Sequence, residues 1–123
     1  MAAITDAREV QLTVPAKPDY IVLARLALSA VCRLTPLQPE DIADLKLAIT
    51  EAATGVMGSG PDAALSFGFQ LEDERLVLEI EGSDDVAISP DEEELGRAII
   101  EATVDECERS GARMRLVKHL DAA

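Results

Sequence analysis

Apolar residues recur at helical spacing in residues 39–59 and form one continuous stripe: Ile42, Leu45, Ile49, Ala52, Ala53 and Val56. Pro39 suits the first position of a helix, and the carboxylates of Glu40 and Asp41 are favourable at the positive end of its dipole. The pattern predicts an amphipathic helix. Glu51 lies beside the stripe, at the rim of the predicted core, where a carboxylate can serve as a general base or remain a solvated helix residue.

Apolar residues at every second position predict strands at residues 10–14, 65–71 and 76–80. The turn at residues 72–74 joins the second and third of these into an antiparallel hairpin. A last strand follows residues 110–111 and directs Met114 and Leu116 inward, with Arg113 and Arg115 outward.

Residues 19–34 predict a helix that is apolar nearly all round and is interrupted mainly by a narrow polar stripe of Arg25, Ser29 and Arg33. One face of a sheet cannot cover so much apolar surface. The helix is therefore either enclosed in the core or also an interface with a partner or a second copy. Arg25 itself is either part of that interface or a surface arginine that extends its head group to water.

A further helix is predicted from Ser89, its N-cap, to about Cys107. Pro90 fits the first helical position and Glu92 completes a capping box. Three apolar residues are expected on one side of this helix: Leu95, Ile99 and Ala102.

The resulting order, β-α-α-β-β-α-β, predicts an α+β fold: a two-layer α/β sandwich with a mostly antiparallel sheet of about four strands and three helices on one face. With 123 residues, we expect a single domain over residues 1–123.

Composition narrows the function classes. A net charge of −13 argues against nucleic-acid binding and suits a basic protein partner. No segment is long and apolar enough to span a membrane, and the first ten residues lack a secretory pattern, so a cytoplasmic protein is expected. Cys32 and Cys107 fall on predicted helices and are expected to be buried, reduced thiols; without a Cys/His cluster, no metal site is expected.

Three segments, VPAKPDYIVLARLALSAV, DLKLAITEAAT and LGRAIIEATVDE, resemble the bacterial anti-sigma factor serine kinases of the RsbW and SpoIIAB type, which belong to the GHKL (histidine-kinase-like) ATPase superfamily. The resemblance covers about residues 9–120. It implies the Bergerat-type GHKL fold, a homodimer, binding of a sigma factor, and phosphorylation of a serine on an antagonist, the STAS-type anti-anti-sigma factor, with Mg·ATP. It places the catalytic glutamate at Glu51 and the partner-binding residues at Arg25 and Ser29.

The chain departs from this family at the nucleotide site. The family's magnesium-binding asparagine falls on Gly55, which offers no side-chain oxygen to a cation. The adenine-binding aspartate falls on Gly82, and the glycines after it on Asp84 and Val86, although a shift of one or two residues would recruit Asp84 or Asp85.

The phosphate-binding loop is also altered. Of its glycines only Gly96 remains, preceded by Glu93 and Glu94, and two like charges 4 Å apart repel by about 1 kcal/mol in water and more near a protein surface. The last turn retains Gly111, but the threonine that follows it in the family is Ala112.

Three hypotheses follow. The first is an anti-sigma-like regulator that binds a sigma factor and/or its antagonist, with ATP use lost or weakened and no cofactor required. The second is an active serine kinase that uses ATP and Mg²⁺, with Glu51 as general base. The third is an accessory domain with an unrelated partner.

Overall fold

The computed structural model of the protein describes residues 8–83 and 88–120. Within these ranges the chain forms five strands, three α-helices and one short 3-10 helix. In order they are β1 (Glu9–Pro15), η2 (Pro18–Tyr20), α1 (Ile21–Cys32), α2 (Pro39–Val56), β2 (Ala64–Leu71), β3 (Arg75–Glu81), α3 (Pro90–Thr103), β4 (Glu106–Ser110) and β5 (Arg113–His119).

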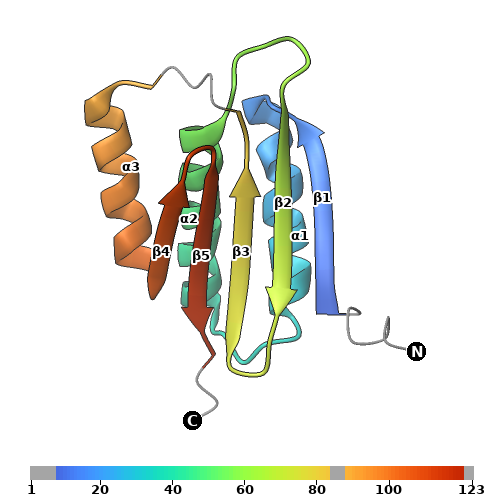
Figure 1. The fold of residues 1–123 in the computed structure, drawn as a ribbon. Coiled ribbons are helices and arrows are strands. Elements are labelled where there is room, and N and C mark those ends of the chain that lie inside the picture. Colours follow the sequence, from blue (N-terminus) through green and yellow to red (C-terminus); the bar gives the residue numbers. More distant parts are fainter. Residues whose placement is uncertain (1–7, 84–87, 121–123) are drawn as a thin grey trace.

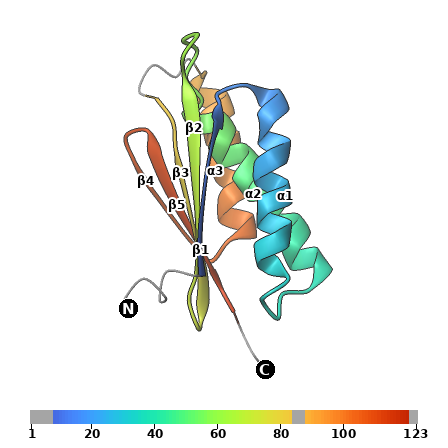
Figure 2. The same cartoon turned by 90° about the vertical axis from the view of Figure 1, so that its right-hand side faces the viewer.

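The strands form one sheet in the order β1-β2-β3-β5-β4, and every neighbouring pair is antiparallel. All three α-helices cover the same face of this sheet (Figure 2), with α2 between α1 and α3 (Figure 1). The predicted α+β two-layer sandwich is confirmed, although the sheet has five strands where about four were expected.

The additional strand, β4, corrects the predicted end of the third helix. That helix ends at Thr103, and the backbone of Val104 is extended, with φ −125° and ψ 167°. Cys107 therefore lies on β4 rather than on a helix. The reason is the hairpin with β5, whose turn contains Gly111 at a φ of 61°, a left-handed conformation that favours glycine.

The core lies between the sheet and the helices. Alternate residues of β2, Leu65, Phe67 and Phe69, are fully buried there, as the alternating pattern predicted. The predicted apolar stripe of α2 is confirmed from Leu45 to Val56 and also contains Ala48, whereas Ile42 is only partly buried.

The flanking helices are buried to very different extents. On α1, one side is in the core while Val22, Leu23 and Leu26 are exposed, so the helix is not enclosed on all sides. On α3, only Ile100 is buried, and Leu95 is 63% exposed. Of the other apolar residues expected on one side of α3, Ile99 is half-buried and Ala102 is exposed. The helix packs mainly against α2.

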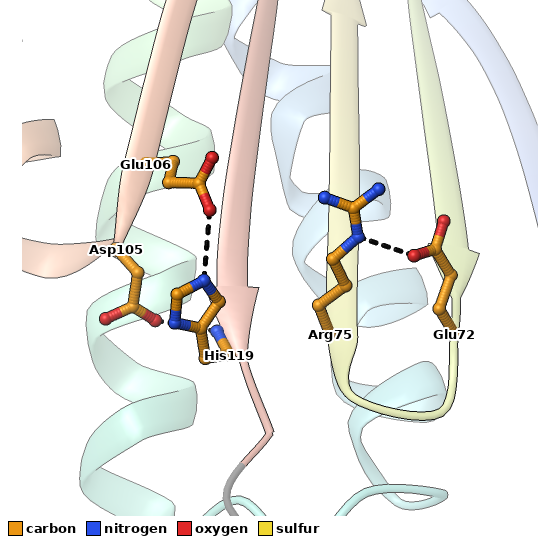
Figure 3. A network of polar contacts seen from close by, with 5 residues as sticks. All are labelled: Glu72, Arg75, Asp105, Glu106 and His119. Atoms are coloured by element: carbon orange, nitrogen blue, oxygen red, sulfur yellow. Dashed lines mark hydrogen bonds and ion pairs between the residues drawn. The ribbon is translucent and has the colours of Figure 1, made fainter.

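Short polar contacts fix one end of the sheet (Figure 3). In the predicted turn between β2 and β3, Arg75 Nε donates to Glu72 Oε1. Where β4 begins and β5 ends, His119 Nε2 lies 3.0 Å from Glu106 Oε2, and the His119 backbone N–H donates to Asp105 Oδ2 at 2.6 Å. These contacts hold the hairpin ends together across neighbouring strands.

Candidate functional site: a cavity between α2 and α3

A cavity of about 470 Å³ opens between the C-terminal half of α2, the helix α3, and the hairpin of β4 and β5. Its walls contain four carboxylates, two guanidinium groups and several apolar side chains. The lining residues are Glu51, Thr54, Gly55, Ile88, Glu92, Glu93, Leu95, Gly96, Arg97, Ile100, Glu101, Cys107, Arg109 and Met114.

The cavity brings together three of the predicted nucleotide-site positions, Glu51, Gly55 and Gly96. Gly82 and Gly111 do not line it. They border a separate depression, which also contains the outward-facing side chains of β3 and β5 such as Glu79 and Arg115. Asp84 and Asp85 lie outside the described residues.

Glu51 of α2 lies close to Gly96 of α3 in the wall of the cavity. A Cβ atom on Gly96 would be 3.3 Å from Glu51 Oε1, so the glycine leaves room for this carboxylate. The Glu51 carboxylate forms no hydrogen bond or ion pair with any residue in the described ranges. Its oxygens are thus available to a ligand or to water in the cavity.

Arg109 crosses the base of the cavity from β4. Its Nε donates to the carbonyl of Gly111 at 3.1 Å, and its Nη2 donates to the carbonyl of Gly55 at 3.3 Å. The third nitrogen, Nη1, lies 4.0 Å from where a Cβ atom on Gly55 would be. A guanidinium group therefore lies directly beside position 55.

One carboxylate lies between the two arginines. Glu93 Oε1 is 3.6 Å from Arg109 Nη1 and also 3.6 Å from Arg97 Nη2. The Arg109 side chain is 30% exposed and that of Arg97 59%, so both head groups remain accessible from the cavity.

Comparison with known proteins assigns this architecture. The histidine kinase-like ATPase domain matches residues 14–118. The serine-protein kinase RsbW of Bacillus pumilus is 31% identical over 120 residues, covering 90% of this chain and 73% of the relative. RsbW of Bacillus licheniformis is 29% identical over 118 residues, with the same coverage of both chains. RsbW of Bacillus subtilis is 27% identical over 117 residues, which cover 90% of this chain and 72% of the relative.

The chain belongs to the histidine kinase-like ATPase family. Within that family it is an RsbW-like member. No helix in the described ranges combines the length and apolar character needed to cross a membrane.

The lining of this RsbW-like cavity does not fit a magnesium ion. Mg²⁺ needs oxygen ligands in octahedral geometry, and Gly55 supplies only a backbone carbonyl, which already accepts from Arg109. The guanidinium of Arg109 adds a positive charge at the same place. In the described part of the chain, no three His, Cys, Asp or Glu side chains form a metal-binding group.

Gly82 has a structural role that the resemblance to the family did not indicate. A Cβ atom there would lie 1.7 Å from the backbone carbonyl oxygen of Val56, at the end of α2. The Gly82 N–H donates to the Ala112 carbonyl at 2.9 Å, and the Ser83 N–H to that of Val56 at 3.0 Å. Glycine at this position lets the chain that follows β3 pass in contact with the end of α2.

The thiol in the cavity wall is not activated. Burial raises the pKa of Cys107, and the nearby carboxylate of Glu101 raises it further, while Arg97 acts in the opposite direction. The thiol is therefore protonated at neutral pH and is a poor nucleophile.

The two arginines of the cavity, Arg97 and Arg109, were not among the site residues expected from the sequence. Arg109 was assigned to the region after a helix, although ECERSGARMRL contains the signal for a hairpin, with Gly111 between two alternating segments. Once β4 is recognised, Arg109 shares the helix-facing side with Cys107, two residues earlier. Arg97 follows Gly96 on α3, and nothing in its neighbours marked it.

Proposed function

We propose that this RsbW-like protein is a cytoplasmic regulator of the anti-sigma type. It binds a sigma factor and/or the STAS-type antagonist of that factor, and its Mg·ATP-dependent phosphorylation is lost or weakened. The observation that carries the proposal is the position of Arg109, hydrogen-bonded to the Gly55 carbonyl where a metal ligand would be needed.

The loss of the metal site has a direct consequence for phosphoryl transfer. Enzymes of this chemistry rely on metal ions to neutralise charge on the transferred phosphoryl group and to align it. Among the described residues, the fixed cation beside Gly55 is the Arg109 guanidinium. The carboxylates of Glu51, Glu92 and Glu101 in the cavity wall repel a triphosphate.

The protein-binding part of the proposal rests on α1. Val22, Leu23 and Leu26 form an exposed apolar surface on this helix, and Leu26 is 61% exposed. Arg25 is partly buried beside them and donates to Thr50 Oγ1 of α2 at 3.3 Å, so its head group is held in a defined place. Ser29 is half-buried one turn further on. Such surfaces commonly mark interaction sites.

The same apolar residues are the surface through which we expect a homodimer or a partner complex to form. A net charge of −13 favours association with a basic partner surface over self-association at low salt. Size-exclusion chromatography with light scattering measures the oligomeric state. A clean monomer would leave the exposed residues of α1 to a different protein.

An active serine kinase is the second candidate. It is favoured by Glu51, which lines the cavity without a partner among the described residues, and by the relatives, which are named serine-protein kinases. In that case Glu51 would accept the proton of the substrate hydroxyl.

A phosphorylation assay separates the two candidates. The protein is incubated with Mg²⁺, labelled ATP and a STAS-type antagonist, and Glu51→Ala is the control. We expect no more label on the antagonist than with Glu51→Ala. Label that depends on Glu51 would overturn the proposal in favour of the kinase.

Partner binding is tested with the same purified proteins. We expect Arg25→Ala to weaken the complex by about tenfold, the loss typical of a well-placed interface arginine. Arg113→Ala is the matched control, because Arg113 is 55% exposed on the opposite face of the sheet. Equal affinity for both variants would count against α1 as the binding surface.

A further inference from the structure

Arg25 of α1 is held by a neutral group of α2 and not by a carboxylate. Its Nη1 donates to Thr50 Oγ1 at 3.3 Å. The guanidinium forms no ion pair with any carboxylate in the described ranges, although the chain has 24 acidic residues against 11 basic ones. A guanidinium has five N–H donors, so its charge and most of its donors stay available to another protein.

The Thr50 hydroxyl is itself oriented by the helix that carries it. It donates to the backbone carbonyl of Lys46, one turn earlier in α2, at 2.8 Å. A hydroxyl has a single proton, so Thr50 can act towards Arg25 only as an acceptor. The bond to Lys46 also selects one of the two rotamers that are open to threonine in a helix. Thr50 therefore presents its lone pairs to α1 in a defined direction.

Both ends of this contact lie on helices that are anchored in the core. Arg25 follows Ala24 and Thr50 follows Ile49, and both of these apolar residues are fully buried. The side chains of Arg25 and Thr50 meet at the partly buried junction of α1 and α2. A long side chain that is already held in place loses less conformational entropy on binding than a free one. The contact thus prepares Arg25 for a binding partner.

We propose that Thr50 is a positioning residue for the protein-binding surface of α1, and that its hydroxyl holds the Arg25 guanidinium in the orientation in which another protein binds it. The proposal rests on the proposed binding at α1 and adds the residue of α2 that prepares this surface. Thr50 acts through Arg25. Without the hydroxyl, the guanidinium keeps its charge but is no longer held, so the loss of affinity is smaller than for Arg25→Ala.

NMR relaxation of the Arg25 Nε–H group tests the contact in the free protein. In Thr50→Val, which keeps the shape of the side chain without the hydroxyl, we expect the order parameter to fall below about 0.6, as is typical of flexible groups. Thr50→Ser keeps a hydroxyl and should restore the wild-type value. Thr103→Val is the matched control, because the half-buried Thr103 makes the same kind of bond, to the Ile99 carbonyl at 2.9 Å, but lies on α3.

Calorimetric titration with the STAS-type antagonist tests the consequence for binding. We expect Thr50→Val to weaken the affinity about three- to fivefold, while Thr50→Ser and Thr103→Val stay within about twofold of the wild type. In the Arg25→Ala protein, Thr50→Val should have no further effect, because the two residues act as one unit. Thr50 is only half-buried, so all variants should fold, and thermal unfolding verifies this.

Two results would overturn the role of Thr50: an Arg25 order parameter that is unchanged in Thr50→Val, or a loss of affinity that is the same with and without Arg25. If Arg25→Ala weakens binding and Thr50→Val does not, the surface on α1 stands and only the positioning role is lost. If Arg25→Ala leaves the affinity unchanged, or the wild type does not bind the antagonist, the proposed binding at α1 fails and the role of Thr50 fails with it.

Discussion

The helices α1 and α3 flank α2 on the same face of the sheet, yet they are attached in different ways (Figure 1). Five residues of α1 are buried: Ile21, Ala24, Leu28, Val31 and Cys32. On α3 only Ile100 is buried, and its first turn carries three carboxylates. Burial of apolar side chains therefore contributes more to the attachment of α1 than to that of α3, which also carries the Glu93 ion pair with Arg109 of β4.

The cavity lies on the side of α2 that faces α3, beside Glu51 and Arg109. Elements with few buried apolar contacts open at a lower free energy than the core. Because α3 has one buried residue and α1 has five, we expect α3 to open at a lower free energy than α1.

The largest expected effect is the difference in stability between a leucine substitution on α1 and one on α3. Leu28→Ala should lower the free energy of unfolding by about 2–5 kcal/mol, because a fully buried leucine leaves a cavity in the core. Leu95→Ala on α3 should change it by less than about 0.5 kcal/mol, since Leu95 is largely exposed. Urea denaturation measures both. Equal losses would mean that α3 belongs to the core as α1 does.

Substitutions at two glycines compare a contact with the backbone, at Gly82, with a contact with a flexible side chain, at Gly96. Gly82→Ala should destabilise the protein by about 3 kcal/mol, because the new methyl group would overlap a backbone carbonyl at the end of α2. In Gly96→Ala the methyl group meets only the end of the flexible Glu51 side chain, and alanine favours the helix.

For Gly96→Ala we therefore expect a change within about 1 kcal/mol in either direction. Thermal unfolding of the two variants in parallel gives the comparison. If Gly96→Ala were as costly as Gly82→Ala, the junction of α2 and α3 would be as rigid as the junction of α2 with the sheet.

The two cysteines allow the α1 and α3 sides of the molecule to be compared through the pH dependence of stability. Burial raises the pKa of Cys32, on α1, to about 11, while the nearby Lys46 acts in the opposite direction. The folded state keeps a proton that the unfolded chain loses above about pH 8.5. The contribution of the protonated thiol to the free energy of unfolding is complete below the pKa of the unfolded chain and is lost as the pH rises towards 11. The free energy of unfolding should therefore fall by about 2 kcal/mol between pH 8 and 10.5.

Urea denaturation across this pH range, under reducing conditions, measures the fall. Cys32→Ala should remove it, and Cys107→Ala should retain most of it because Cys107 is only half-buried beside α3. If the free energy of unfolding fell as much in Cys32→Ala, other titrating groups would be the cause and not the burial of the Cys32 thiol.

Most of the fold could be predicted from local patterns. The alternation in β2 and β3, the stripe of α2 and the Ser89 cap, whose Oγ accepts from the Glu92 N–H at 3.2 Å, are properties of neighbouring residues. The end of α3 could not be predicted as well, because residues 106–110 are polar and become a strand only through pairing with β5.

The candidate site was predictable only in part. Glu51, Gly55 and Gly96 were expected together through the resemblance, and they line one cavity. The contacts of Arg109 join β4 to carbonyls of α2 and of the β4–β5 turn, and its ion pair reaches α3. Contacts between segments so distant in sequence leave no local pattern.

The sequence by itself determined the elements and the fold class, because hydrophobic periodicity and capping act between residues a few positions apart. Only the tertiary structure decided that α3 carries a single buried residue, that Gly82 contacts the end of α2, and that two arginines converge on Glu93. These features depend on how separate elements meet in space, and packing and charge at such junctions are set by the folded chain as a whole.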